Sequence, residues 1–316
     1  GVVGVWVAIG RRRAETWHVV ESLRRAGGRF VLVAAFEDMS PGLRYLAPYA
    51  GAAVAEYFAE RGEHALVVYD ELTAHAVAWR ELSLLLRRPP GREAFPGDVF
   101  YLHARLLERA AQLSSEAGGG SITALPVARL EGGRLTAYIP TNLISITDGQ
   151  LVLSRGLFAA GQKPAIDAGL SVSRVGAKAQ SQAVKELAGR LRLDYAAFLE
   201  LEAFSKLGTH LEASTARRIA LGQRVRGLLR AARLEPLGLF AEVVRLLLAD
   251  TPELLLRVPP ERVPDVAREL TAECERSAAG LALKVERSAV LSDADRAALL
   301  ELLTAFIDAR FPKEGG

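Results

Sequence analysis

Short apolar runs rich in valine and isoleucine alternate with segments of helical periodicity through the first half of the chain. Three of these runs cover residues 2–8, 30–35 and 65–69, and an amphipathic stretch follows each of them. Strands that are buried on both faces need continuous apolar runs of this kind, and intervening helices imply parallel pairing. Further runs at 121–127 and 143–146 extend the pattern. We therefore predict an α/β fold with a mostly parallel sheet covered by helices.

The second half of the chain changes character at about residue 183. From there to residue 311, leucine, alanine, arginine and glutamate recur with helical periodicity and no strand pattern. Ser292 and the acidic residues after it are typical of a helix N-cap. We predict two domains, an α/β domain at 1–182 and an all-α C-terminal bundle at 183–316. Breaks between helices are expected near Gly208, Pro236, Pro252, Pro259-Pro260 and Ser292.

The N-terminal strand leads to an expectation about the edge of the sheet. The chain opens on Gly1, and residues 2–8 already form a strand-like run. Because proteins rarely open inside a strand, we infer that an N-terminal part is missing. The first strand is then expected at the broken edge of the sheet, where unpaired backbone groups favour aggregation.

Composition excludes several classes of protein. The 316 residues carry 40 basic and 37 acidic side chains, so the net charge of +3 argues only weakly for nucleic-acid binding. A single cysteine, Cys274, rules out an intrachain disulfide, and the five histidines lack metal-ligand spacing. No stretch reaches the roughly 18 apolar residues of a spanning helix. We expect no nucleic-acid partner and no metal held by histidine and cysteine.

Asp70 ends one of the apolar runs. At the carboxyl edge of a parallel sheet, an aspartate can hold a Mg²⁺-bound water in a nucleotide site. Capping of the following helix is the commoner role for such an acid, and Thr73 is a further candidate for that cap. Both roles remain open on this segment alone.

The segment 89–97 carries three prolines and two glycines. Prolines restrict φ and stiffen a loop, which suits a bearing surface or a subunit contact at Pro89, Pro90, Gly91 and Pro96. An ordinary connecting loop is favoured from these residues alone.

A glycine-rich segment at 118–121 could cradle phosphate, but no lysine with serine or threonine follows it. No segment of the chain reads G-x-x-x-x-G-K-S/T. Glycine runs without that sequel are usually turns. The chain as given is therefore not expected to hold a nucleoside triphosphate tightly.

Arg174 lies in a Ser/Gly-rich loop at 171–176, 29 residues after Ser145. A planar guanidinium on a short loop suits phosphate oxygens, and arginines supplied across an interface serve phosphoryl transfer. On spacing alone, an ordinary surface arginine is favoured.

Four segments together closely resemble the alpha subunit of F-type rotary ATP synthases. They are residues 43–56, 84–111, 137–150 and 171–176, in the order of that family. The match is dense from about residue 5 to 195 and then fades to a compatible helical pattern. The resemblance implies a RecA-like nucleotide domain joined to a C-terminal helical bundle. The family's N-terminal β-barrel and P-loop would lie upstream of Gly1.

The resemblance also implies a role for each matched residue. In that family alpha and beta subunits alternate in a hetero-hexamer around a rotating stalk, and alpha binds nucleotide without turning it over. Arg174 matches the arginine finger that alpha lends to the ATP site of beta. Ser171 matches a serine needed for activity, and Ser145 matches one lining the same interface.

Further matches concern the nucleotide site of the chain itself and the stalk. Asp70 matches the strand-end acid near Mg²⁺, and Lys163 and Pro164 fall where the family places residues beside adenine. The resemblance thus implies ATP or ADP with Mg²⁺ as cofactor. The segment 89–97 matches the collar around the central stalk, gamma. Delta, of the peripheral stalk, is a further implied partner. Any membrane association runs through the ion-translocating sector, at the cytoplasmic face of a prokaryotic inner membrane.

The chain departs from the family at several positions. Arg11 stands where catalytic beta subunits carry a glutamate and typical alpha subunits a glutamine; an arginine cannot act as a general base at neutral pH. Lys163 replaces an arginine, Glu71 replaces an aspartate, and 231–233 replaces a Gln-Pro-Gln stretch that reaches the nucleotide. The bundle around Pro259-Pro260 is similar to alternate alpha subunits associated with sodium-linked rotary ATPases.

Three other functions are weighed against a regulatory alpha subunit. A self-sufficient hexameric ATPase of flagellar or secretion type would need a glutamate where Arg11 stands. A nucleic-acid motor of termination-factor type would need a basic or aromatic strand-binding face, which the sequence does not offer. A degenerate scaffold would keep only the subunit interface.

Overall fold

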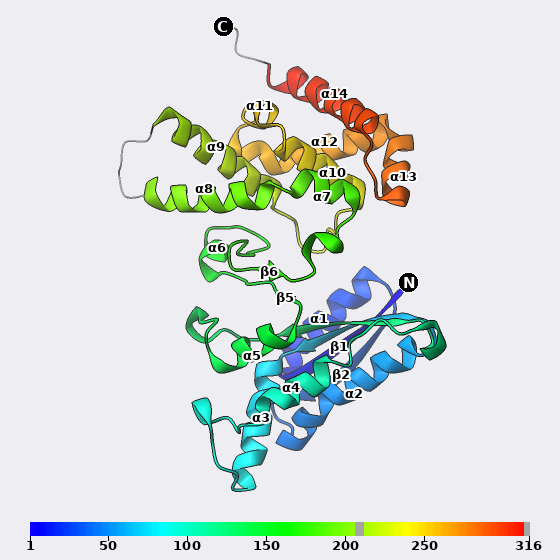
Figure 1. The fold of residues 1–316 in the computed structure, drawn as a ribbon, viewed down its shortest axis with the longest axis vertical. Coiled ribbons are helices and arrows are strands. Elements are labelled where there is room, and N and C mark those ends of the chain that lie inside the picture. Colours follow the sequence, from blue (N-terminus) through cyan, green and yellow to red (C-terminus); the bar gives the residue numbers. More distant parts are fainter. Residues whose placement is uncertain (206–211, 313–316) are drawn as a thin grey trace. The chain divides into compact units, whose positions relative to one another are not determined.

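The computed structural model describes residues 1–205 and 212–312 (Figure 1). The chain divides into two compact units, Gly1–Asp148 and Gly149–Gly316. The expected break at Gly208 lies outside the described residues.

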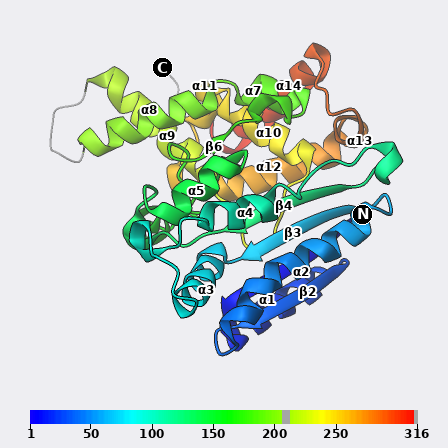
Figure 2. The same ribbon diagram turned by 60° about the horizontal axis from the view of Figure 1, so that its bottom comes forward.

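The first unit contains a parallel sheet with helices packed along it (Figures 1 and 2). Short 3₁₀ turns occupy Arg92–Ala94, Ser115–Ala117 and Glu131–Gly133. The strands and α-helices, in chain order, are β1 (Val2–Arg11), α1 (Arg13–Ala26), β2 (Phe30–Phe36), α2 (Pro41–Ala59), β3 (His64–Asp70), α3 (Leu72–Leu85), α4 (Val99–Leu107), β4 (Ser121–Val127) and α5 (Tyr138–Ile146).

The strand order in this sheet is β2-β1-β3-β4, and every neighbouring pair is parallel. This confirms the predicted parallel sheet. The expectation that the first strand forms an edge is wrong, because β1 lies between β2 and β3. The connection from β2 through α2 crosses back over β1 before β3 begins, so chain order and sheet order differ.

Small residues along α2 allow it to lie close to the sheet. Ser40 caps α2 by accepting a hydrogen bond from the backbone N–H of Leu43, and Pro41 occupies the first turn. A Cβ atom at Gly51 would stand 2.3 Å from Cγ2 of Val7 on β1. The buried core of this unit therefore depends on a helix face of alanines and one glycine, which includes Ala47, Ala52, Ala55 and Ala59.

Two local predictions were wrong. Residues 143–146 do not form a strand but the end of α5, because Ile139 and Leu143 share one buried helix face that packs near α4. Thr73 does not cap α3. It lies inside the helix, and its hydroxyl accepts a hydrogen bond from the backbone N–H of Arg129 at 2.9 Å.

The glycine segment before β4 is a tight turn, in line with the commoner interpretation of such runs. Gly118 has φ of 105°, in the left-handed region. At Gly120 a Cβ atom would stand 2.3 Å from the carbonyl oxygens of Ala59 and Glu63. The glycines here let two backbone segments approach closely.

The second unit begins with short β-structure and continues as helices. Beyond residue 181 its described part is helical, which confirms the predicted all-α C-terminal region. Its elements are β5 (Gly149–Gln150), α6 (Arg155–Ala159), β6 (Val172–Ser173), α7 (Gln182–Ala188), α8 (Leu191–Ser205), α9 (Ala213–Leu228), α10 (Leu239–Ala249), α11 (Pro252–Leu255), α12 (Val263–Ser277), α13 (Ala279–Ser288) and α14 (Asp293–Arg310), with 3₁₀ turns at Gly176–Lys178 and Pro260–Arg262.

The helices of the second unit share one apolar core. Val243, Val244, Leu247 and Leu248 of α10 lie in it, together with residues of most other helices. The predicted cap before α14 is confirmed as a capping box, in which the side chains of Ser292 and Asp295 each accept a backbone hydrogen bond. None of the described helices is both long enough and apolar enough to span a bilayer.

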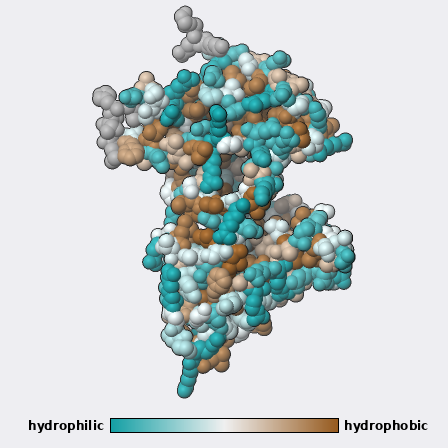
Figure 3. Space-filling view, viewed as in Figure 1, coloured by the Kyte–Doolittle hydropathy of each residue, from teal (hydrophilic) through white to brown (hydrophobic). Residues whose placement is uncertain are grey.

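Large apolar side chains also remain on the surface. Brown areas mark them among the hydrophilic side chains on the face that Figure 3 shows. Leu85 and Leu86, at the end of α3, are among the most exposed of these, and Arg87 and Arg88 separate them from the proline-rich loop at 89–97.

Candidate functional site

The carboxyl ends of β1 and β3 bring Arg11 and Asp70 together. The two strands pair in parallel, with Ala8 opposite Asp70, so residues that follow them meet at one edge of the sheet. Arg11 Nε lies 3.4 Å from Asp70 Oδ2, and its NH2 group lies 3.4 Å from Glu15 Oε2. Arg11, which departs from the family, is therefore paired with Asp70, the predicted strand-end acid.

Both acids at this edge are buried and have an arginine partner. Burial raises the pKa of Asp70, and the Arg11 charge opposes that rise. Burial likewise raises the pKa of Glu71, against the opposing charge of Arg129, whose NH2 group lies 3.0 Å from Glu71 Oε1. Burying a carboxylate is costly unless it is paired, and each arginine reduces that cost.

The role predicted for Asp70 is to hold Mg²⁺ through a bound water, and it stays a prediction. Asp70 and Glu71 each face an arginine. Across residues 1–205 and 212–312 there is no group of three or more histidine, cysteine, aspartate or glutamate side chains that could hold a metal. Mg²⁺ in a nucleotide site usually takes one or two carboxylates together with waters and phosphate oxygens, a ligand set that protein side chains do not supply alone.

The Arg174 loop is held at its base by a short β-ladder. Val172 and Ser173 of β6 pair antiparallel with Gly149 and Gln150 of β5, and exposed Arg174 follows directly. Gly149 has φ of 155°, and a Cβ atom there would stand 2.3 Å from the carbonyl oxygen of Val172. The loop thus emerges from a close backbone pairing.

Ser171 anchors the same loop. Its hydroxyl donates to the carbonyl oxygen of Asp167 at 2.6 Å and accepts from the backbone N–H of Val152 at 3.0 Å. Its own carbonyl oxygen accepts from Arg192 at 2.9 Å. Ser171 therefore positions the chain next to Arg174 through these three hydrogen bonds and a fourth, from its backbone N–H to the carbonyl oxygen of Asp167 at 3.0 Å.

Ser145 belongs to the first unit, whereas Ser171 and Arg174 belong to the second. Ser145 lies exposed on α5, and its hydroxyl donates a hydrogen bond to the carbonyl oxygen of Thr141 at 2.9 Å.

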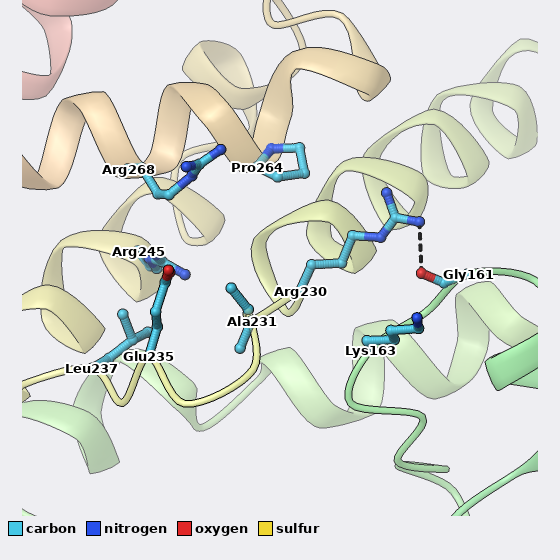
Figure 4. Close-up of a pocket in the computed structure, with 10 residues that line it drawn as sticks. Gly161, Lys163, Arg230, Ala231, Glu235, Leu237, Arg245, Pro264 and Arg268 are labelled. Atoms are coloured by element: carbon cyan, nitrogen blue, oxygen red, sulfur yellow. Dashed lines mark hydrogen bonds between the residues drawn. The ribbon is translucent and has the colours of Figure 1, made fainter. Parts of the chain in front are cut away.

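Lys163 lies beside the segment that replaces Gln-Pro-Gln. The backbone N–H of Ala231 donates to the carbonyl oxygen of Lys163 at 3.0 Å, and Arg230 donates to that of Gly161 at 2.9 Å. Both segments line a pocket of about 270 Å³ in the second unit, whose lining side chains Figure 4 shows. Pro164 follows Lys163 through a cis peptide bond and is exposed.

Sequence reasoning missed three cations of this pocket, which are Arg230, Arg245 on α10 and Arg268 on α12. Arg245 does leave a signal, since it is the one basic residue within the apolar helix Leu239–Ala249. Nothing in the sequence indicates that Arg268 faces it.

The proline-rich loop is tied down on one side and exposed on the other. Phe95 and Pro96 are buried, while Pro89, Pro90 and Gly91 are exposed. Asp98 accepts hydrogen bonds from the indole of Trp79 at 2.9 Å and from Arg88 at 2.8 Å, and Glu93 accepts from the backbone of Tyr138. The buried Phe95 and Pro96, together with these hydrogen bonds, therefore fix the base of the loop. Its exposed part is Pro89, Pro90 and Gly91.

In open α/β proteins with a parallel sheet, ligands bind beyond the carboxyl ends of the strands, which is where the charged groups of this sheet lie. Residues 1–173 match the nucleotide-binding domain of the ATP synthase alpha/beta family, and residues 180–306 match its C-terminal domain. The chain belongs to the ATP synthase alpha/beta family.

The curated relatives are named as alpha subunits. ATP synthase subunit alpha 1 of Paraburkholderia xenovorans is 55% identical over 86% of this chain and 53% of the relative. Subunit alpha 3 of the same organism is 51% identical over 95% and 56%, and subunit alpha 2 of Burkholderia thailandensis is 57% identical over 78% and 44%. The resemblance to an alpha subunit is thus confirmed, and the chain spans about half the length of these relatives.

Proposed function

We propose that the protein acts as the non-catalytic, regulatory alpha subunit in the head of an F-type rotary ATP synthase. The names of its relatives support this assignment. So does Arg11, because a guanidinium that is paired with Asp70 cannot take a proton from an attacking water. ATP or ADP is the cofactor that membership of a nucleotide-binding family supports.

Arg174 is proposed as a finger for the ATP site of the adjacent beta subunit. The observation that carries this is an exposed arginine directly after the β5–β6 ladder and beside the anchored Ser171. A guanidinium held in a closed cleft stabilises the charge on a transferring phosphoryl group. Delivery from a neighbouring subunit would let closure of the interface, driven by the stalk, gate the chemistry. Ser145 is proposed to line the same interface.

The proposed partners follow from the same family. Beta subunits would alternate with this chain in a hetero-hexamer, and delta would bind as part of the peripheral stalk. The exposed Pro89–Pro90–Gly91 corner, which Arg87 and Arg88 join to the exposed Leu84, Leu85 and Leu86, is proposed as the surface that meets the central stalk, gamma. The complex would lie at the cytoplasmic face of a prokaryotic inner membrane and attach to it only through the ion-translocating sector.

Replacement of Arg174 in the full-length subunit, assembled with its beta partner, tests this function. We expect Arg174→Ala to lower multisite ATP hydrolysis by about 10³-fold, because fingers contribute about 10³–10⁵ in rate. Arg174→Lys is expected to fail as well, since lysine lacks the planar fork. Steady-state turnover of the purified complex is the measurement.

Arg287→Ala is a matched control, because Arg287 is an exposed arginine on α13 of the same unit. It should leave turnover unchanged. Unchanged turnover in Arg174→Ala would contradict the finger assignment. Hydrolysis by the 316-residue chain alone would instead favour a self-sufficient ATPase.

A further inference from the structure

The pocket in the second unit is strongly cationic. Lys163, Arg230, Arg245 and Arg268 line it, and Glu235 is the one acid in its lining (Figure 4). The pocket volume of about 270 Å³ is well above the roughly 30 Å³ share of one water molecule. A small polyatomic anion therefore fits the space that these four cations surround.

Three of the cations are partly compensated. Arg230 donates one hydrogen bond to the carbonyl oxygen of Gly161 at 2.9 Å, which leaves other donors of its guanidinium available. Lys163 Nζ lies 5.2 Å from the centre of the Phe158 ring. Arg268 forms an exposed ion pair with Asp265, on its own helix.

Arg245 is the least compensated of the four. Its Nε is buried without a hydrogen-bond partner, and none of the ion pairs of the described residues includes it. Burial and then the charge of Arg268 lower its pKa. A half-buried guanidinium without a carboxylate is costly, and an anion between Arg245 and Arg268 would relieve both the desolvation and the repulsion.

The composition of the lining bears on which part of a nucleotide the pocket could hold. It contains no aromatic side chain on which a base could stack, and its apolar members are small or aliphatic, including Ala231, Ala232 and Leu237. Guanidinium groups match the geometry of phosphate oxygens.

We propose that this pocket is a binding site for a phosphoryl anion, anchored by Arg245 and Arg268 and flanked by Lys163 and Arg230. The anion is either free phosphate or pyrophosphate, or the phosphate group of a nucleotide. The proposal goes beyond the function proposed above and does not involve Arg174, so either can fail without the other.

Calorimetric titration of the 316-residue chain at constant ionic strength tests the proposal with pyrophosphate, inorganic phosphate, ADP and adenosine as probes. We expect pyrophosphate to bind and adenosine not to bind, because the phosphate and not the base is recognised. If pyrophosphate and ADP bind with equal affinity, the phosphoryl groups alone determine the binding. Binding of adenosine, or no binding of pyrophosphate, would overturn the proposal.

Two variants locate the site. Arg245→Gln and Arg268→Gln should each weaken pyrophosphate binding by roughly tenfold or more, as expected for loss of a charged hydrogen-bond donor. Arg276→Gln is the matched control, because Arg276 is an exposed arginine on the same helix as Arg268 and pairs with Glu273. It should bind as the parent chain does. Thermal melts of all three check that each is folded, and undiminished binding by a folded Arg245→Gln would refute the assignment.

Discussion

Two histidines, His75 and His103, are fully buried in the first unit, with ring centres 5.6 Å apart. His75 shares a hydrogen bond with the carbonyl oxygen of Tyr45 at 3.1 Å and stacks on the Tyr45 ring. Neither ring nitrogen of His103 meets the geometry of a hydrogen bond among the described residues, although the backbone of Leu72 lies near enough to oppose the fall in its pKa. Burial lowers the pKa of His75 to about 3 and that of His103 to about 4. Both side chains are therefore neutral in the folded chain at physiological pH.

Acid should destabilise the first unit through these histidines. Their unfolded-state pKa is about 6.5. The unfolded chain thus takes up protons first as pH falls below that value, and stability present above pH 6.5 is lost towards pH 4. The loss between neutral pH and pH 5 is on the order of 2 kcal/mol per histidine. Urea denaturation at a series of pH values measures it.

Replacement of His103 by leucine isolates its share of this effect. Leucine removes a buried group with unsatisfied nitrogens, so His103→Leu should be at least as stable as the parent chain at pH 7 and lose less stability at pH 5. His18→Leu, at an exposed histidine on α1, should keep the pH dependence of the parent chain. Equal pH dependence in the His103 variant and the parent would contradict this explanation.

The packing of two helices depends on one glycine. Gly222 on α9 faces Phe198 on α8, and a Cβ atom there would stand 2.0 Å from Cγ of the ring. Phe198 is buried in the core of the helical unit. The ring cannot keep its position if the glycine gains a side chain.

Gly222→Ala is expected to destabilise the helical unit by about 1–3 kcal/mol, as overpacking does. Gly280→Ala is the matched control, because Gly280 lies in α13 and has open space around its Cβ position. It should be neutral or stabilising by about 0.5–1 kcal/mol. The midpoints of urea denaturation, followed by circular dichroism, compare the two, and a Gly222→Ala chain as stable as Gly280→Ala would refute the packing argument.

At the scale of the whole chain, the edge strands of the sheet bear on whether one copy pairs with another. The sheet order leaves β2 and β4 at the edges. The start of β4 is covered by an antiparallel bridge between Gln112 and Ser121. Farther along β4, Leu125 and Val127 are exposed at 48% and 40%. An exposed edge with apolar side chains is a template for pairing between molecules.

Leu125→Lys is therefore expected to reduce self-association of the 316-residue chain, because a charge on an edge strand opposes pairing with a second copy. Light scattering over a range of concentrations measures the change. Leu193→Lys is the control, since Leu193 is 73% exposed but lies on helix α8. An equal reduction in both variants would indicate general surface apolarity and not the strand edge.

Prediction from sequence succeeded where the signal is local. The β-branched runs at the first three strands, the Ser292 cap and the proline breaks all depend on neighbouring residues. It failed at residues 143–146, where β-branched composition suggested a strand but burial of one helix face decided the structure. The helix cap predicted at Thr73 was wrong for a similar reason, because its hydroxyl accepts a hydrogen bond from the backbone N–H of Arg129, far along the chain.

The candidate site follows the same division. The sequence could propose Asp70 and Lys163 as site residues, because the segments around them occur in the same order as in the family. The pairing of Asp70 with Arg11, and the approach of Arg245 to Arg268, could not. Each joins groups from separate elements, and no local pattern specifies which side chains will share a pocket.

By itself, the sequence determined the alternation of strands and helices, the change to an all-helical part, and the family to which the chain belongs, because these depend on short patterns and on long matching runs. Only the tertiary structure decided that β1 is a central strand, that Arg11 neutralises Asp70, and that four cations converge on one pocket. The physical reason is that burial and charge act between residues that are close in space, whatever their distance along the chain.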